Sequence, residues 1–428
     1  MRHTEWLKIG RAEKGQLSTT TDMTNVNPRS RDKRPLWLAM ALALIWVPSL
    51  DRGFCEDDFL LVPITFSTFL DNPLWGAGTP PPVREGLPAY RGEGRPVSSL
   101  TYALLPAQAP VQHVVSLLLY LACLWLMWRV CSRLALAPRP TFFALSSFFH
   151  PAFLWNVTWI AHRYDLLVIA LLLLAVLETR VPIKVALIGL GSGAKPPLFF
   201  QNFVFAYQFA RQGRIAAGAV TLCWLAVFAV GIYLTRYTEE SAVVDSLYTL
   251  PVVISIPLRI VKLFEGLLYV FAPIPMFAVT AWMPFVALGV YGALWVAVLR
   301  SPMTSVRESI RRHGWIPAMA AAMSVPFLFA SDVRITGAAS VITFLWLATV
   351  VRCDGVRMTA IVAILVLNLT GIFLNYGAFR SAQYDIRADM AGCNFYSQPV
   401  YAFAGSREEL RRNILTVLGI RTEFRRFP

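Results

Sequence analysis

This chain has few charged residues for its length. Only 15% of its 428 residues are Asp, Glu, Lys or Arg, and 56% are hydrophobic, whereas a soluble domain usually carries about 25% charged residues. The mean hydropathy is +0.55. Several apolar runs reach about 20 residues, which is enough to cross a hydrocarbon core about 30 Å thick. The scarcity of charge excludes an ordinary soluble domain, and we expect an all-α polytopic membrane protein.

Acidic residues are scarcer than basic ones. Asp and Glu number 25 against 39 Lys and Arg, so the formal net charge is +14. No basic stretch carries interleaved aromatic residues in a soluble domain, so we do not expect nucleic-acid binding. Lys and Arg instead concentrate between apolar runs, as they do in cytoplasmic loops of membrane proteins. Residues 1–34 are a polar, basic tail, and no signal-peptide cleavage site follows the first apolar run, so we expect this tail in the cytoplasm.

The alternation of apolar and basic segments predicts about eleven transmembrane helices in a domain that covers residues 35–376. Residues 377–428 would be a small tail on the outer side. Gly and Pro around Lys195 break what would otherwise be a single span, and two short spans would meet there. The predicted spans are 35–50, 111–128, 141–155, 166–177, the pair within 183–210, 215–234, 276–299, 315–330, 335–351 and 358–376.

Two long loops are expected on the outer side. The first, 51–110, is rich in Pro and Gly and contains an apolar stretch, 59–70, that suits a helix lying in the membrane interface. The second, 235–275, has charged residues at three-residue steps, which predicts an amphipathic helix on the outer surface; they are Arg259, Lys262 and Glu265. A membrane-spanning helix over 251–272 is the alternative, and it would change the number of spans by one.

Cysteine is rare, with six residues in the chain. Only Cys55 and Cys393 fall on the predicted outer side, where a disulfide can persist. A bridge between them would tie the C-terminal tail to the first loop. Two free cysteines are the alternative.

Charged residues near the predicted span ends gather on the outer side. Three adjacent carboxylates, Glu56, Asp57 and Asp58, directly follow the first span, and carboxylates beside hydrocarbon usually mark a site or a water-filled cavity. A carboxylate can accept a proton from an attacking hydroxyl, and Arg or Lys can hold a phosphate. The pattern indicates a site where a base works beside a bound anion. The other members of this outer group are Arg95, His150, His162, Arg163, Asp165, Lys195, Asp332 and Arg334.

Each of these residues also has a structural interpretation. The three carboxylates can begin a solvated loop, and Asp165 can stabilise the N-terminus of a helix. Lys195 can snorkel to the surface, His150 can be a packing histidine, and Arg95 can be an ordinary loop residue. Asp332 and Arg334 can cap two spans. A functional site is favoured because all of these residues are predicted to lie on the same side of the membrane.

Five segments, in this order, resemble GT-C glycosyltransferases. The stretch 56–59 is similar to the acidic motif in the first outer loop of that superfamily. Four more resemble segments of the transmembrane O-mannosyltransferases that carry tetratricopeptide repeats: an arginine–proline segment at Arg95, the His150-Pro151 and Arg163-x-Asp165 stretch, a lysine between short spans at Lys195, and an acidic-x-arginine loop at Asp332–Arg334. Ile335 stands where that group has an aromatic residue, and the chain has no tetratricopeptide array.

The resemblance implies a GT-C-like architecture and an inverting glycosyltransferase. The lack of a tetratricopeptide array leaves the acceptor open and favours an enzyme of a bacterial inner membrane. The enzyme would move a sugar from a polyprenyl-phosphate donor to a hydroxyl of an envelope glycan, lipid or protein on the outer face. Asp57 would be the base, with Asp58 and Glu56 beside it. The donor phosphate would be held by Lys195, Arg334, Arg163 and Arg95, with His150, His162, Asp165 and Asp332 in supporting roles. No cofactor is required. A divalent metal is optional, with Asp57 and Asp58 as its only candidate ligands.

Three other functions remain open. A transporter or flippase for a lipid-linked sugar would also use membrane-embedded charges and broken helices, but it predicts internal repeats and charges at mid-span, and the sequence shows neither. A ligase for lipid-linked sugars would centre on arginines and a histidine in a large late loop, whereas the largest loop here comes first. A non-catalytic scaffold would need none of these charges. The glycosyltransferase is the favoured interpretation.

Overall fold

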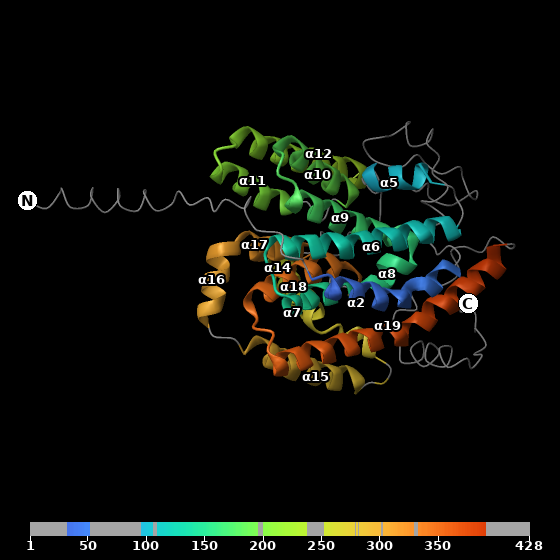
Figure 1. Cartoon of the computed structure of the whole chain (residues 1–428). Coiled ribbons are helices and arrows are strands. Elements are labelled where there is room, and N and C mark those ends of the chain that lie inside the picture. The colour runs from blue at the N-terminus through green and yellow to red at the C-terminus, as the bar shows by residue number, and fades with distance from the viewer. Residues whose placement is uncertain are drawn as a thin grey trace, which may run out of the picture. The chain divides into compact units, whose positions relative to one another are not determined.

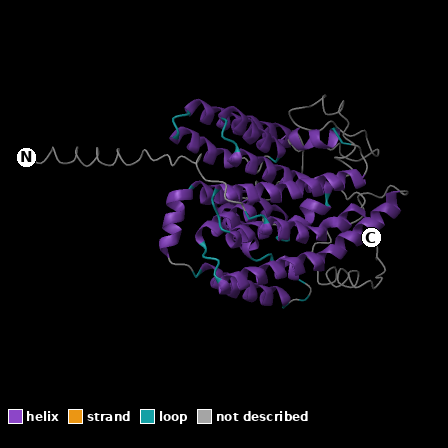
Figure 2. Ribbon diagram, in the orientation of Figure 1, coloured by secondary structure: helices purple, strands orange, loops and turns teal. Residues whose placement is uncertain are grey.

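The computed structural model describes residues 32–51, 96–105, 109–195, 200–237, 252–278, 280, 282–300, 303–328 and 333–390. Within these ranges every regular element is a helix (Figure 2). This confirms the all-α fold class for the part of the chain that is described. All the helices belong to the unit Arg34–Pro428. Several predicted features lie outside the described residues: Cys55, Glu56, Asp57, Asp58, the apolar stretch 59–70, Arg95, Asp332 and Cys393.

The helices of the first half of the chain run from blue to green in Figure 1. They are α2 (Arg34–Leu42), η2 (Ala43–Asp51), α5 (Pro96–Ala103), α6 (Ala109–Arg133), α7 (Pro138–Ser146), η3 (Ser147–Phe149), α8 (Phe153–Thr158), η4 (Ile160–His162), α9 (Arg163–Leu177), α10 (Val181–Ala194), α11 (Gln201–Arg211) and α12 (Ile215–Tyr237), where η denotes a 3₁₀ helix.

The second half continues with longer helices and short 3₁₀ connections. They are α14 (Val252–Phe271), η6 (Ile274–Phe277), α15 (Met283–Leu299), α16 (Met303–His313), α17 (Trp315–Ser324), η7 (Val325–Leu328), η8 (Val333–Thr336), α18 (Gly337–Val350) and α19 (Gly355–Met390). Helix α19 therefore continues beyond residue 376, where the last predicted span ends, into the predicted tail.

Two helical segments are long and apolar enough to cross a membrane, Pro110–Arg133 of α6 and Gly355–Tyr376 of α19. Six further apolar helical segments of 10 to 17 residues coincide with predicted spans. Proline falls where two of them change from α-helix to 3₁₀ helix: Pro48 lies inside η2 and Pro326 inside η7. Since a full crossing takes about 20 helical residues, the figure of eleven transmembrane helices stays a prediction.

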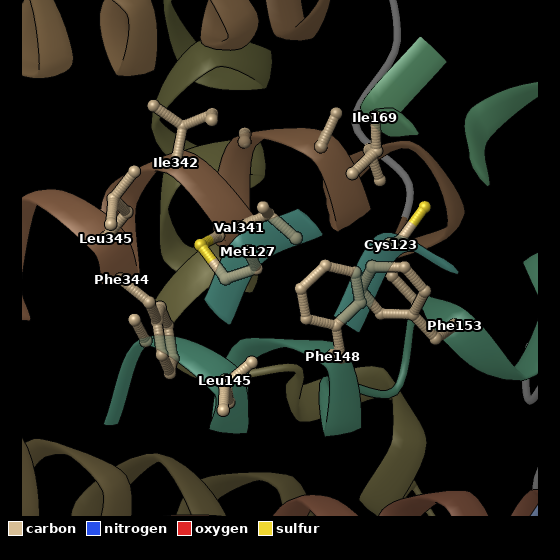
Figure 3. Packing of buried hydrophobic residues seen from close by; sticks show 14 of the residues in the cluster. Cys123, Met127, Leu145, Phe148, Phe153, Ile169, Val341, Ile342, Phe344 and Leu345 are labelled. Atoms are coloured by element: carbon tan, nitrogen blue, oxygen red, sulfur yellow. The ribbon is translucent and has the colours of Figure 1, made fainter. Parts of the chain in front are cut away.

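Aromatic side chains pack α6 against η3 and α8. The ring of Tyr120 lies edge-on to Phe148 and Phe153, with 5.9 Å between ring centroids in each pair. The Tyr120 hydroxyl donates to the Phe148 carbonyl oxygen at 2.8 Å. Close by, Met127 of α6 and Val341 of α18 belong to the same buried core (Figure 3). This packing holds the segment 150–163, which leads into the candidate site, against the bundle.

Arginines tie together the loops at one end of the bundle. Arg133 Nη1 donates to the Leu177 carbonyl at 2.5 Å, Arg139 Nη1 to the Cys353 carbonyl at 3.4 Å, and Arg357 Nη2 to the Arg300 carbonyl at 2.5 Å. These contacts bring together the loops that follow α6, α9, α15 and α18. We call this the basic end. These are the loops that the sequence predicts on the cytoplasmic side.

At the opposite, N-terminal end of α6, Gln112 contacts Arg163 at the start of α9. We call this the site end. Gln112 and Arg133 are 21 helical residues apart in α6, which corresponds to about 30 Å at 1.5 Å per residue. That separation matches the thickness of a hydrocarbon core.

Candidate functional site

The structure brings together four of the predicted site residues around the N-terminus of α9. His162 closes η4, and Arg163 and Asp165 lie in the first turn of α9. Lys195 directly follows α10, which packs along α9. Helix α10 runs through its three glycines to Ala194 and ends before Pro196, and α11 begins at Gln201, so the predicted break between two short helices is present. All four side chains are buried.

Asp165 and Lys195 form an ion pair in the protein interior. The Lys195 ammonium contacts Oδ1 of Asp165, and the two side chains are only 7% and 4% exposed for Lys195 and Asp165 respectively. The ammonium also lies 4.8 Å from the ring centroid of Tyr164, at cation–π distance. Because the lysine turns toward Asp165 and not toward the surface, this geometry argues against the snorkelling interpretation.

His162 lies beside this pair. Its Nδ1 is 3.2 Å from the Tyr164 hydroxyl, and its ring centroid is 4.4 Å from that of Trp159. Tyr164 therefore contacts both the imidazole of His162 and the ammonium of Lys195. His162, Tyr164, Asp165 and Lys195 therefore form one contiguous cluster of side chains.

Arg163 connects α9 to α5 and α6. Its Nη1 donates to Gln112 Oε1 at 2.7 Å, and its Nη2 is 3.5 Å from Thr101 Oγ1. The guanidinium carbon lies 4.7 Å from the ring centroid of Tyr102. These partners orient Arg163 inside the protein. A part in holding the donor phosphate stays a prediction for this residue.

Two hydrogen bonds join α5 directly to the segments that form the site. Ser98 Oγ donates to the Ala194 carbonyl at 2.7 Å, one residue before Lys195. The Tyr102 hydroxyl donates to the Ile160 carbonyl at 2.9 Å. Helix α5 is the first described element after the segment that contains Glu56, Asp57 and Asp58. Helix α5 therefore lies beside Lys195.

His150 belongs to a different contact. Its Nε2 lies 2.9 Å from the Tyr269 carbonyl oxygen, and its Nδ1 accepts from the Ala152 amide at 3.2 Å. An Nε2–H tautomer satisfies both nitrogens within the protein and joins η3 to α14. This geometry favours the packing interpretation of His150. Arg334 lies in η8, and its side chain is outside the described part, as is Asp332.

The polar partners of Arg163 were not identified from the sequence. Gln112 and His113 stand at the start of an otherwise apolar helix and are fully buried. Burying two adjacent polar side chains in an apolar helix costs free energy unless they have hydrogen-bond partners. Their position in the sequence could therefore have indicated buried polar partners. Thr101 and Tyr102 end the segment 95–102 that resembles the arginine–proline segment, and no role was predicted for either of them.

No metal centre is assigned. In the described ranges, no group of three or more His, Cys, Asp or Glu side chains is placed to hold a metal ion. The predicted candidates, Asp57 and Asp58, lie outside those ranges. The four cysteines that the structure describes, Cys123, Cys131, Cys223 and Cys353, are free thiols.

No protein-family model matches this chain, and neither a curated protein nor a solved structure matches it.

Proposed function

We propose that this chain is an integral membrane glycosyltransferase of GT-C-like architecture with about eleven spans. It transfers a sugar with inversion from a polyprenyl-phosphate donor to a hydroxyl of an envelope glycan, lipid or protein on the outer face. One observation carries the proposal: the buried Asp165–Lys195 pair lies beside α5, the first described helix after the segment of the sequence that bears the acidic cluster.

The two ends of the bundle support a membrane-embedded arrangement. Arginine-rich loops gather at the basic end, as positive charge does on the cytoplasmic side of membrane proteins. Large apolar side chains lie exposed in the middle of helices between the ends, among them Leu118 (59%) of α6 and Val366 (55%) of α19. Soluble proteins rarely leave so much large apolar surface uncovered. With the basic end inside, the site end faces outward.

The cluster suits a reaction that produces a phosphate anion. The acceptor hydroxyl oxygen attacks the anomeric carbon of the sugar while the bond from that carbon to the phosphate oxygen breaks. Asp57, or Asp58 beside it, takes the hydroxyl proton. Lys195 neutralises the charge on the leaving polyprenyl phosphate. Asp165 keeps the ammonium charged and oriented before the phosphate arrives, and a phosphate monoester leaving group does not require a metal.

A reconstituted assay tests the proposal. The purified chain in nanodiscs would receive labelled polyprenyl-phosphate sugars and envelope extract, and transferred label would be counted. Lys195→Gln should lower the rate about 10- to 100-fold, the effect of losing a hydrogen bond to a charged group, about 1.5–3 kcal/mol. Arg307→Gln is the control, because Arg307 is an exposed cation of α16, which follows α15 at the basic end.

Cellular glycan analysis gives a second readout. Asp57→Asn at matched expression should remove one sugar substituent from envelope lipids or proteins, which identifies donor and acceptor together. An unchanged glycan profile with folded protein would contradict the assignment of Asp57 as the base. Movement of a lipid-linked sugar between leaflets without transfer would indicate the transporter.

A further inference from the structure

Three cationic side chains from separate parts of the chain converge at the basic end. Lys184 lies in α10, with its ammonium 5.5 Å from the ring centroid of Phe205 in α11. The ammonium is close enough to Arg133 and Arg214 to be repelled by both guanidinium groups. Arg133 ends α6, and Arg214 lies in the turn between α11 and α12. The fold therefore concentrates positive charge at one place, where the three like charges repel one another.

Packing fixes the position of each cation. Arg133 Nη1 donates to the Leu177 carbonyl oxygen at 2.5 Å, at the C-terminal end of α9. Helix α10 packs along α9, and α12 packs on both α10 and α11 (Figure 1). The Arg214 amide donates to the Phe209 carbonyl oxygen at 2.8 Å, one turn of α11 beyond the ring that contacts Lys184. These contacts hold the three charges together against their mutual repulsion.

One carboxylate lies near these cations, and its oxygens have other partners. Glu178 attracts the Lys184 ammonium, but its Oε1 already accepts hydrogen bonds from the Arg180 amide at 2.8 Å and from Arg180 Nε at 3.3 Å. In the described ranges, none of the three converging cations forms an ion pair with a carboxylate. An anion bound between them would therefore be attracted by all three.

In the proposed membrane orientation, these cations lie at the depth of the phospholipid headgroups, directly outside the hydrocarbon core. Exposed apolar side chains lie close to them on α9, α10 and α12: Leu174 (38%), Ile183 (37%) and Ile215 (73%). Ile183 precedes Lys184 in the chain, and Ile215 follows Arg214. Basic pockets between transmembrane helices on the cytoplasmic side bind anionic headgroups. A ligand that joins a phosphate to hydrocarbon chains matches both the charge and the apolar surface.

We propose that Arg133, Lys184 and Arg214 bind the phosphate of an anionic phospholipid of the cytoplasmic leaflet, with its acyl chains against the exposed apolar side chains of α9, α10 and α12. This inference rests on the membrane orientation in the proposed function and is independent of the sugar-transfer reaction. The lipid lies at the opposite end of the bundle from Lys195. Its phosphate bridges the end of α6 to α10 and to the turn before α12, which otherwise repel one another.

Binding of single lipids tests the inference. The purified chain in a non-ionic detergent would be titrated with phosphatidylglycerol, and native mass spectrometry would give the Kd of the first bound lipid. Arg133→Gln, Lys184→Gln and Arg214→Gln should each weaken binding about fivefold, the effect of one cation beside an anionic lipid. Lys184→Arg keeps the charge and should bind like the unaltered chain. Arg307→Gln is the control, because Arg307 is an exposed cation of α16, which packs on α17 and α18.

Two further ligands identify what the site recognises. Phosphatidylcholine has the acyl chains without a net charge, and glycerol phosphate has the charge without the chains, so each should bind about tenfold more weakly than phosphatidylglycerol, or weaker still. Equal binding of phosphatidylcholine would overturn the role of the cations. Equal binding of glycerol phosphate would indicate a site for a soluble anion and overturn the lipid assignment. Unchanged Kd values for all three glutamine variants, with folding confirmed by size-exclusion chromatography, would overturn the inference.

The sugar-transfer assay separates this inference from the proposed reaction. Selective binding of phosphatidylglycerol that is weakened in the glutamine variants, with no transfer from any donor, would refute the proposed reaction and leave the lipid site standing. Sugar transfer by the unaltered chain, with lipid Kd values that are the same in all variants, would refute the lipid site alone.

Discussion

The ammonium of Lys195 contacts the carboxylate of Asp165, although 30 residues separate them in the chain. The contact holds the break between α10 and α11 against the first turn of α9. Because both side chains are nearly inaccessible to solvent, removal of one charge leaves the other buried without its partner. The free energy of unfolding therefore depends on whether both charges of this buried pair are present.

A double-mutant cycle measures this coupling. Asp165→Asn and Lys195→Gln should each destabilise the fold by about 3–5 kcal/mol, the usual cost of breaking a buried pair from one side. The double variant should lose clearly less than the sum of the two, because no uncompensated charge remains. Unfolding in detergent, followed by circular dichroism, gives the values.

The control for this cycle is Glu308→Gln, which removes the partner of Arg312 in α16. The side chains of Arg312 and Glu308 are 68% and 41% exposed, and exposed ion pairs contribute little, so stability should stay nearly unchanged. Additive losses for Asp165 and Lys195 would show that the two residues act independently.

The close approach of α14 and η7 predicts the effect of a single methyl group. Gly266→Ala should destabilise the fold by about 1–3 kcal/mol, as overpacking of a core does, because its Cβ atom meets the ring of the fully buried Phe327. Addition of Phe327→Ala should remove the clash, so the pair should be less destabilised than the sum of both changes. Thermal unfolding measures each variant.

Gly292→Ala is the matched control for this substitution. Gly292 lies in α15, and a Cβ atom there would meet nothing within 4 Å. Alanine in an open helical position should stabilise by about 0.5–1 kcal/mol. Equal effects at positions 266 and 292 would show that α14 does not lie against η7 as described.

The thiol of Cys353 should react slowly with maleimides. Burial raises the pKa of Cys353 to about 11, and Asp354 adds to this shift, against the opposing effect of Arg139 and Arg357. Only the thiolate is nucleophilic, so at pH 8 the rate should lie about 100-fold below that of a thiol with a pKa near 9. The rate should rise about tenfold per pH unit until the pH approaches 11.

A variant that keeps Cys353 as its single cysteine is suited to stopped-flow labelling. The comparison is a cysteine-free chain with Arg352→Cys, since Arg352 is an exposed neighbour in the same loop. Rapid labelling of Cys353 at pH 7 would contradict the buried environment of its thiol.

The two ends of the bundle should be labelled from opposite sides of a membrane. Leu104 follows α5 at the site end and is 64% exposed, and Arg352 lies at the basic end. In spheroplasts, a membrane-impermeant maleimide should label Leu104→Cys directly and Arg352→Cys only after the membrane is opened. The reverse pattern would invert the proposed orientation, and labelling of both from outside would contradict a transmembrane bundle.

Local patterns predicted much of the helical framework. The break at Lys195 follows from Gly and Pro in its neighbourhood, and the helical stripe of Arg259 and Lys262 follows from three-residue spacing. The extent to which α14 is buried in the bundle could not be predicted from such local patterns. Its C-terminal end is buried because Trp295 and His150 contact its last carbonyls, and these partners lie far from it in the chain.

The sequence by itself determined the helical fold class, the segregation of arginines into one set of loops and the residue types available for phosphate chemistry, because composition and periodicity are local properties. Only the tertiary structure decided which of those residues meet. It joined Asp165 to Lys195 and Arg163 to Gln112, and set His150 apart in a packing contact. Each of these pairings depends on how helices distant in sequence pack, since a buried charge settles beside the partner that packing brings within reach.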